Sequence, residues 1–356
     1  MGTHIPSIVD TKELLKKNQI GIIGVGETEQ GKIPGKSSFH FLSEASKLAI
    51  EDAGLQKSDV DGVITAFSLV EETFMHCTTF ADYIGINPKY FESVAIGGAT
   101  AVWMTAAAAM AINSGQAEVV LCVRGDNTLS GISSTGMIAL IREMCHGEFE
   151  FPFGLTTPGG YALMAQRYLH ETKGKREHLH SVAVTMREHA KLKENAMMKD
   201  DLTLDDVMGT RLLASPLTKF DCSIVSDGGA AFIVTTNAKA KELGLKRDPV
   251  YLHGMGQGFS HQYLTSCEDL DQIYGAVEKS GKKAFDTAGM TNDNVDITFL
   301  YDCFTITTLL ELEGLGIVPK GQAGAYALEG RLHKDADTPI NTHGGLLSQA
   351  HLGAMH

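Results

Sequence analysis

Residues 49–54 read AIEDAG, and a short polar turn after them leads to Val60-Asp61. The pattern returns at residues 284–289 as AFDTAG, followed by Val295-Asp296, so each position recurs 235 residues later (49 to 284). Both copies predict the end of a helix at its glycine, a turn, and then a strand. Similarity across so long an interval indicates two related halves rather than a solenoid of short repeats.

The composition limits the classes of protein to which the chain can belong. Its 356 residues are enough for two units with substantial cores. A net charge of −13 argues against a nucleic-acid binder, because neutralising a phosphate backbone needs clustered Lys and Arg. The longest apolar run, residues 101–112, is too short to span a bilayer, and no apolar signal segment opens the chain. We therefore expect a cytoplasmic protein without membrane insertion.

Three features of the sequence bear on cofactor or metal binding. The six cysteines are scattered without a CxxC pair, which disfavours a disulfide framework and a zinc site. Gly24-Val25-Gly26 follows a predicted strand, yet the third glycine of a dinucleotide-binding motif would fall at Glu29. His178 and His180 are two apart on a predicted helix and do not share a face, so we expect both at the surface and no bound metal.

Strands and helices alternate through the first half. The predicted elements are, in order, strand 19–25, helix 38–53, strand 60–67, an Ala-rich helix opened by residues 97–100, and strand 118–123. Residues 1–18 are polar and are expected to form a loosely held arm. Strand 230–234 then closes the first half as an edge of small residues. This order builds an α/β layered unit.

The alternation lapses between about residues 126 and 206, which predicts an inserted loop domain. An amphipathic helix is expected at residues 180–192. Basic residues stand out in this acidic chain, and they are Lys173, Lys175, Arg176, Arg187, Lys191 and Lys193. They favour either a solvated helix face or a landing site for an anionic cofactor.

The second half repeats the strand and helix pattern. Its predicted elements are strand 250–255, helix 270–288, strand 296–301, helix 307–315, and a Gly-rich stretch at residues 341–351. No low-complexity linker separates the halves, so we place the boundary between 1–238 and 239–356.

Three motifs, together with the duplication, carry a family resemblance. They are Ser226-Asp227-Gly228-Gly229, Tyr301-Asp302-Cys303-Phe304-Thr305, and the stretch from Asn341 to His351. With them the chain resembles the thiolase superfamily from about residue 19 onward, and most closely its sterol carrier protein X and lipid-transfer-protein branch, which includes acyl-CoA retro-aldolases. The resemblance implies a duplicated five-layer αβαβα fold, a loop domain over coenzyme A, and a dimer formed through the first half.

The resemblance also shows what this chain lacks. Thiolases place a nucleophilic Cys at the start of a helix in the first half, where this sequence reads Gly98-Ala99-Thr100. Glycine supplies neither a thiolate nor a proton, so the usual covalent acyl transfer is not available. Backbone amides near Gly98 remain as donors to a carbonyl or enolate oxygen. Without the family, Gly98 would be read as a residue for close helix packing.

Two residues of the second half are candidates for the chemistry. Tyr301 stands where thiolases have His or Asn, and a phenol can transfer a proton. His351 stands at the position of the family's Gly-His-Pro histidine, although here no Pro follows; imidazole suits an enolate oxygen or a proton shuttle. A core tyrosine is the alternative for Tyr301, and His343 is the nearest competitor of His351. The second cysteine that thiolases carry in their last strands is not present. Either a tail is missing or the protein does without this element, and we favour a missing tail, because an unpaired sheet edge would be exposed.

The resemblance implies binding of a coenzyme A thioester as substrate, with no covalently bound cofactor. The candidates for holding it are Arg187, Lys191, His343, Gly344 and Gly345.

The predicted activity is retro-aldol cleavage of a β-hydroxyacyl-CoA into a carbonyl product and a shorter acyl-CoA. The alternatives are a thiolase or acyltransferase working through another thiol such as Cys303, and a non-catalytic acyl-CoA or lipid carrier. The resemblance further implies a homodimer and a small OB-fold partner with a zinc ribbon. The segment 137–144 and Met197-Met198 could offer adaptable contact surface to that partner.

Overall fold

The computed structural model describes residue 13, residue 15 and residues 19–352 apart from residues 72 and 246. The predicted arm at residues 1–18 therefore lies almost wholly outside the described residues. Within them, no helix has both the length and the apolarity needed to cross a membrane.

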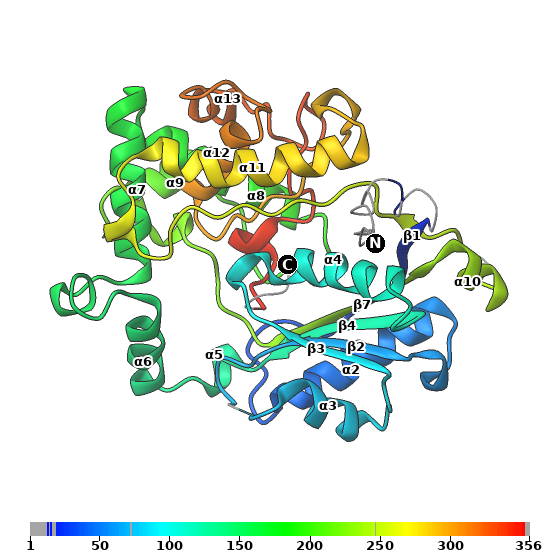
Figure 1. Cartoon of the computed structure of the whole chain (residues 1–356). Coiled ribbons are helices and arrows are strands. Elements are labelled where there is room, and N and C mark those ends of the chain that lie inside the picture. Colours follow the sequence, from blue (N-terminus) through cyan, green and yellow to red (C-terminus); the bar gives the residue numbers. More distant parts are fainter. Residues whose placement is uncertain (1–12, 14, 16–18, 72, 246, 353–356) are drawn as a thin grey trace, which may run out of the picture.

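One six-stranded sheet forms the centre of the first half (Figure 1). Its strands, in spatial order, are β3 (Tyr90–Val94), β2 (Gly62–Ala66), β4 (Val119–Asp126), β7 (Gly228–Thr236), β1 (Ile20–Glu27) and β8 (Val250–Tyr251). β2 pairs in parallel with β3 and β4, whereas β7 runs antiparallel to both β4 and β1. The prediction that the strand after Ser226 forms an edge is wrong, because β7 lies between two strands. Its small residues let helices pack closely on an interior strand.

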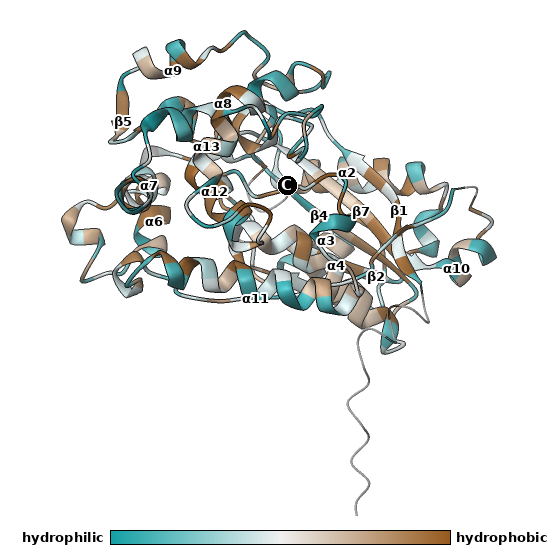
Figure 2. Cartoon of the chain, turned by 90° about the horizontal axis from the view of Figure 1, so that it is seen from above, coloured by the Kyte–Doolittle hydropathy of each residue, from teal (hydrophilic) through white to brown (hydrophobic). Residues whose placement is uncertain are grey.

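Helices cover both faces of this sheet. Helices α2 (Ser38–Ala53) and α3 (His76–Ile84) lie on one face and α4 (Thr100–Asn113) on the other (Figure 1). Alternate residues of β4 separate into two cores, because successive side chains of a strand point to opposite faces. Leu121 and Val123 join the core beneath α2, while Val120 and Cys122 join the core beneath α4. Hydrophobic residues are concentrated on these strands (Figure 2).

The duplication predicted from residues 49–54 appears in the structure. Helix α2 has its counterpart in α11 (Leu270–Ala288), and both end at a left-handed glycine, Gly54 and Gly289, each with φ of 69°. A short 3₁₀ turn follows each helix, at Lys57–Asp59 and at Asn292–Asn294. Both helices end at the residues that the sequence predicted.

Paired glycines pack against these two helices in the same way. A Cβ on Gly24 would lie 2.5 Å from the carbonyl oxygen of Ala49, and one on Gly254 would lie 2.1 Å from that of Ala284. Ala49 and Ala284 are equivalent positions of the repeat. Gly24 therefore serves close packing between strand and helix.

We expect Gly254→Ala to destabilise the protein by about 1–3 kcal/mol, because its methyl group would overlap backbone that cannot move without shifting α11. Gly275→Ala within α11 is the matched control. Its Cβ would meet nothing within 4 Å, so the substitution should be neutral or stabilise by up to about 1 kcal/mol. Chemical denaturation of both variants measures the difference, and equal stabilities would contradict this account of the repeat.

The segment between β4 and β7 is mainly helical. It contains α5 (Thr128–Gly131), α6 (Ser134–Met144), α7 (Thr157–Thr172), α8 (Arg176–Ala190) and α9 (Leu204–Gly209), with a small sheet of β5 (Leu212–Ala214) and β6 (Leu217–Thr218). The predicted surface position of His180 is wrong. His180 is fully buried in α8, and its Nδ1 lies 2.8 Å from Oδ1 of Asp221. That partner is distant in sequence, so the helix pattern could not indicate it.

The second half stacks on the open side of α4. Its other helices are α12 (Thr305–Gly314) and α13 (Ala323–Leu328), while α10 (Asn237–Glu242) extends from the far end of the sheet (Figure 1). The predicted strand 250–255 is shortened to β8, which joins the first sheet. The predicted strand 296–301 makes only an isolated bridge, from Thr298 to Ile340. A cavity of about 780 Å³ lies between this layer and α4.

Candidate active site

The start of α4 meets the second half of the chain at Gly98. A 3₁₀ turn at Gly97–Ala99 leads into α4, and the ring of Tyr301 lies directly against it. A Cβ on Gly98 would lie 2.2 Å from Cζ of Tyr301, well inside van der Waals contact. The tyrosine ring therefore occupies the space that any side chain at position 98 would need.

His351 completes a three-residue cluster. Its Nε2 lies 3.4 Å from the phenol oxygen of Tyr301, and its Nδ1 lies 3.1 Å from Oγ of Ser223. The backbone of His351 is fixed by Ser226, whose Oγ accepts its N–H at 3.0 Å and whose N–H donates to its carbonyl oxygen at 3.3 Å. The three catalytic candidates of the sequence thus lie together.

Burial and nearby acidic groups keep the phenol of Tyr301 protonated. Burial raises its pKa above the usual value, as do Cys303, Asp302 and Glu311, while Arg124 acts in the opposite direction. The Tyr301 N–H donates to Oε2 of Glu311 at 2.9 Å, and burial raises the pKa of Glu311 to about 8. The resting phenol is a hydrogen-bond donor facing an imidazole.

The segment that carries His351 is held by a buried carboxyl group. Asp302 accepts hydrogen bonds from Leu346 N at 2.8 Å and Leu347 N at 3.3 Å. Burial raises the pKa of Asp302 to about 7, although these amides favour its charged form. Gly345 has φ of 59°, and a Cβ there would lie 1.9 Å from Oδ2 of Asp302. Gly344 likewise has φ of 106° and packs on Ala190.

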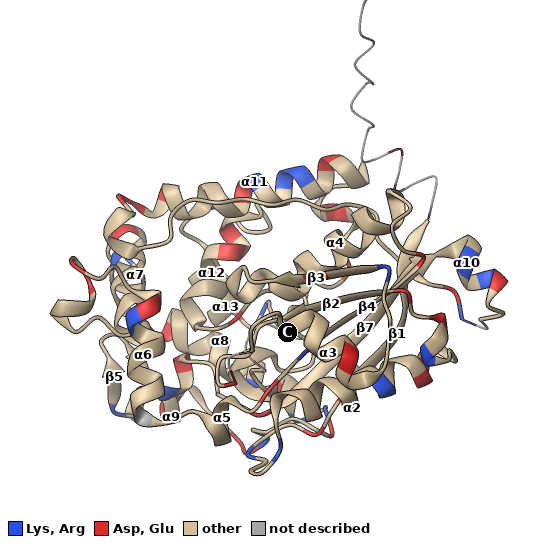
Figure 3. Cartoon of the chain, turned by 60° about the horizontal axis from the view of Figure 1, so that its bottom comes forward, with Lys and Arg blue, Asp and Glu red and all other residues tan. Residues whose placement is uncertain are grey.

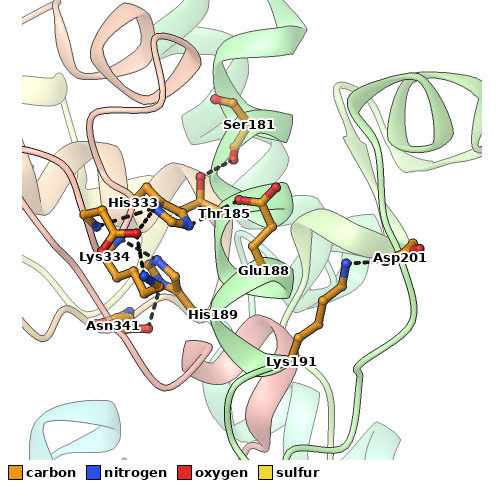
Figure 4. Close-up of polar contacts among 10 residues, drawn as sticks. Ser181, Thr185, Glu188, His189, Lys191, Asp201, His333, Lys334 and Asn341 are labelled. Atoms are coloured by element: carbon orange, nitrogen blue, oxygen red, sulfur yellow. Dashed lines mark hydrogen bonds and ion pairs between the residues drawn. The ribbon is translucent and has the colours of Figure 1, made fainter.

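The basic candidates lie apart from the cluster of Gly98, Tyr301 and His351. Arg187 is buried, and its guanidinium donates to Oγ of Ser348 at 3.2 Å and to the carbonyl oxygen of Asp200 at 3.3 Å. Lys191 is paired with Asp201 near the surface of α8 (Figure 4). Elsewhere on the chain, acidic and basic residues are mixed along the helices α10 and α11, so neither helix presents a purely basic face (Figure 3). Binding of coenzyme A by Arg187 and Lys191 stays a prediction.

His343 lines a separate cleft of about 760 Å³ together with Glu27, Lys193 and Asn195. Burial lowers the pKa of His343 to about 4, so its imidazole is neutral at physiological pH. The roles predicted for His343, Gly344 and Gly345 toward coenzyme A also stay predictions. Within the described residues, no three His, Cys, Asp or Glu side chains come together as metal ligands.

Sequence reasoning missed three residues around Tyr301 and His351. Ser223 contacts the imidazole of His351, and Glu311 accepts the backbone N–H of Tyr301. Nothing in their local sequence sets either residue apart. Arg124 gave a signal that could have been used, because it is a lone cation following the buried apolar run of β4.

Known proteins are similar to this chain over most of its length. The family model described as "Thiolase C-terminal domain-like" matches residues 256–356. A steroid side-chain-cleaving aldolase of Thermomonospora curvata is 35% identical, over 94% of this chain and 87% of its own. The 17-hydroxy-3-oxo-4-pregnene-20-carboxyl-CoA lyase of Mycobacterium tuberculosis is 33% identical, over 95% and 89%.

Two further comparisons concern activity and fold. An acetyl-CoA acetyltransferase of Methanothermobacter thermautotrophicus is 31% identical, over 94% of this chain and 87% of its own. The solved structure named "Ltp2-ChsH2(DUF35) aldolase" superposes with a TM-score of 0.83 at 34% identity, covering 94% of this chain and 86% of that one.

Proposed function

The chain belongs to the thiolase superfamily, in the branch of the acyl-CoA retro-aldolases, and we propose that it cleaves a β-hydroxyacyl-CoA to a carbonyl product and a shorter acyl-CoA. The observation that carries this proposal is the packing of Tyr301 into the space beside Gly98. Where a covalent thiolase needs a thiol, this site offers a phenol and an imidazole.

Tyr301 and His351 divide the proton transfers between them. Since the phenol is protonated at rest, Tyr301 accepts the proton of the β-hydroxyl group while passing its own proton to Nε2 of His351. The hydroxyl oxygen becomes the carbonyl, the bond between the α and β carbons breaks, and its electron pair forms a thioester enolate. The imidazolium and the amides near Gly98 stabilise the enolate oxygen. Return of the proton to the α carbon releases the shorter acyl-CoA.

The experiment that tests this function is an assay of purified protein with 17-hydroxy-3-oxo-4-pregnene-20-carboxyl-CoA, the compound in the name of one relative. We expect a ketone and a shorter acyl-CoA in equal amounts, identified by mass spectrometry. A panel of steroid, aromatic and short-chain β-hydroxyacyl-CoA compounds then defines the acyl group. Tight binding of acyl-CoA without turnover, even with a partner added, would instead favour a non-catalytic carrier.

Acyl transfer is the second candidate, because one relative is named an acetyltransferase. It would need a reactive thiol, and Cys303 is the thiol two residues after Tyr301. Burial raises the pKa of Cys303 to about 12, and the side chain is 4% exposed, so it makes a poor nucleophile. An acyl-enzyme thioester detected by mass spectrometry would overturn the aldolase proposal.

The predicted assembly, compartment and domain division belong to this proposal. A homodimer is supported by β3, an edge strand whose Phe91 is 54% exposed, because such an edge invites pairing with another strand. A small partner protein is supported by the two-component name of the aldolase structure. The proposal also includes a cytoplasmic location, a coenzyme A thioester as the ligand, and two halves at 1–238 and 239–356. Light scattering of the protein alone and with a candidate partner tests the assembly.

A further inference from the structure

Arg124 is a buried cation with unused hydrogen-bond donors. Its side chain is 1% exposed, and its Nη2 donates to Oδ2 of Asp126 at 3.1 Å. Its Nε and Nη1 have no hydrogen-bond partner within the described part of the chain. Because a guanidinium has five N–H donors and desolvating it is costly, buried arginines normally bond most of them. The two unpartnered nitrogens therefore point to a group that acts only during the reaction.

The topology places Arg124 beside the catalytic candidates. On β4, Cys122 faces α4, since its Sγ lies 3.7 Å from the carbonyl oxygen of Met104. Arg124 is two residues further on and so faces the same side. Arg124 lies at the carboxyl end of β4, and α4 begins after the carboxyl end of β3. Both β3 and β4 are parallel to β2, so these two carboxyl ends lie on the same side. Arg124 and Gly98 are thus at the same edge of the sheet.

The charges around Tyr301 leave a role for this cation. Cys303, Asp302 and Glu311 all oppose negative charge on the phenol oxygen, and His351 contacts that oxygen. The neighbouring side chain of Tyr161 is half-buried against the same core. Arg124 is the group whose charge favours the ionised phenol. Asp126 offsets part of that charge and also accepts from Ser68 Oγ at 2.8 Å and Leu69 N.

We propose that Arg124 is a positioning residue that acts through Tyr301, the unpartnered N–H groups on its Nε and Nη1 stabilising the negative charge that develops on the phenol oxygen during proton transfer. This role rests on the proposed retro-aldol function. The loss of the phenol proton to His351 runs ahead of the arrival of the β-hydroxyl proton, so negative charge develops on the phenol oxygen between the two transfers. Arg124 exchanges no atom and acts by its charge.

The test uses a titration that does not depend on turnover. Tyr301 is replaced in the full chain by 3,5-difluorotyrosine, whose more acidic phenol brings its ionisation into a measurable pH range. Ultraviolet absorbance then gives its pKa with Arg124 and with Arg124→Gln. We expect Arg124→Gln to raise that pKa by about 1 unit, because an opposite charge nearby favours the ionised phenol. An unchanged pKa would overturn the proposal.

Control variants separate charge from folding. Arg124→Lys keeps the charge and should retain most of the effect. Arg124→Gln combined with Asp126→Asn removes both charges of the buried pair. If Arg124→Gln alone unfolds because Asp126 is left unpaired, the pKa of the phenol can still be measured in this double variant. Arg247→Gln removes an exposed arginine paired with Asp52 at 2.7 Å and should leave the titration unchanged.

Cleavage assays then distinguish the two levels of the proposal. If the wild-type protein cleaves a β-hydroxyacyl-CoA, Arg124→Gln should lower kcat with little change in KM. Difluorotyrosine at position 301 should then restore part of the lost kcat. A purely structural role of Arg124 would predict no such rescue. If the titration shifts but no β-hydroxyacyl-CoA is cleaved, the proposed function fails while the coupling of Arg124 to Tyr301 stands.

Discussion

Replacing Tyr301 by phenylalanine is expected to lower kcat for retro-aldol cleavage by about 10²–10⁴-fold with little change in KM, the usual contribution of a group that transfers a proton. The phenylalanine ring keeps the packing against Gly98 and removes only the oxygen that lies 3.4 Å from Nε2 of His351. Steady-state kinetics with a cleaved β-hydroxyacyl-CoA measures both constants.

The matched control is Tyr326→Phe. Its phenol on α13 bonds Oγ1 of Thr338 at 2.6 Å, away from Tyr301 and His351, so kcat should be unchanged. The assignment of roles is wrong if Tyr301→Phe cleaves normally while His351→Ala is inactive. That result would make the imidazole the sole proton acceptor.

Introducing a side chain at Gly98 should lower both the rate of cleavage and the stability of the protein. The Cβ of Gly98→Ala would lie 2.2 Å from Cζ of Tyr301, so the ring must move or the start of α4 must shift. A displacement of about 1 Å in a catalytic group can cost about 10²-fold in rate, and overpacking typically costs about 1–3 kcal/mol of stability. We expect both losses, measured by kinetics and by chemical denaturation.

A double-mutant cycle isolates the cause. Tyr301→Ala should remove most of the stability cost of Gly98→Ala, because the contact that makes alanine unfavourable is gone, while activity stays lost. Gly160→Ala is the control, since its Cβ would meet nothing within 4 Å. Full activity of Gly98→Ala, or additive stability losses in the cycle, would show that Gly98 and Tyr301 do not compete for one space.

The same contact explains why the aldolase and thiolase arrangements exclude each other in this chain. A cysteine at position 98 would need the space that the Tyr301 ring fills. We therefore expect Gly98→Cys to form no acyl-enzyme unless Tyr301 is also replaced by a smaller residue. Mass spectrometry of the single and double variants after incubation with acyl-CoA would detect the thioester.

Local elements of the fold were predictable to the residue where capping and periodicity agree. Helices α2 and α11 have the predicted bounds, because their apolar spacing and terminal glycines act within one segment. The interior position of β7 was not predictable, since strand order depends on pairing between distant segments. His180 was misplaced for a similar reason, as Asp221 and not its own helix decides its burial.

The sequence by itself determined that the chain consists of two related halves, that no thiol stands at position 98, and that Tyr301 and His351 occupy motif positions, because each of these is a matter of residue type and order. Only the tertiary structure decided that the Tyr301 ring takes the place of a side chain at Gly98, that His351 reaches the phenol, and that Arg124 keeps its Nε and Nη1 unpartnered at the same end of the sheet. Such contacts join segments far apart in the chain, and only tertiary packing sets the distances between these side chains and the charges that surround them.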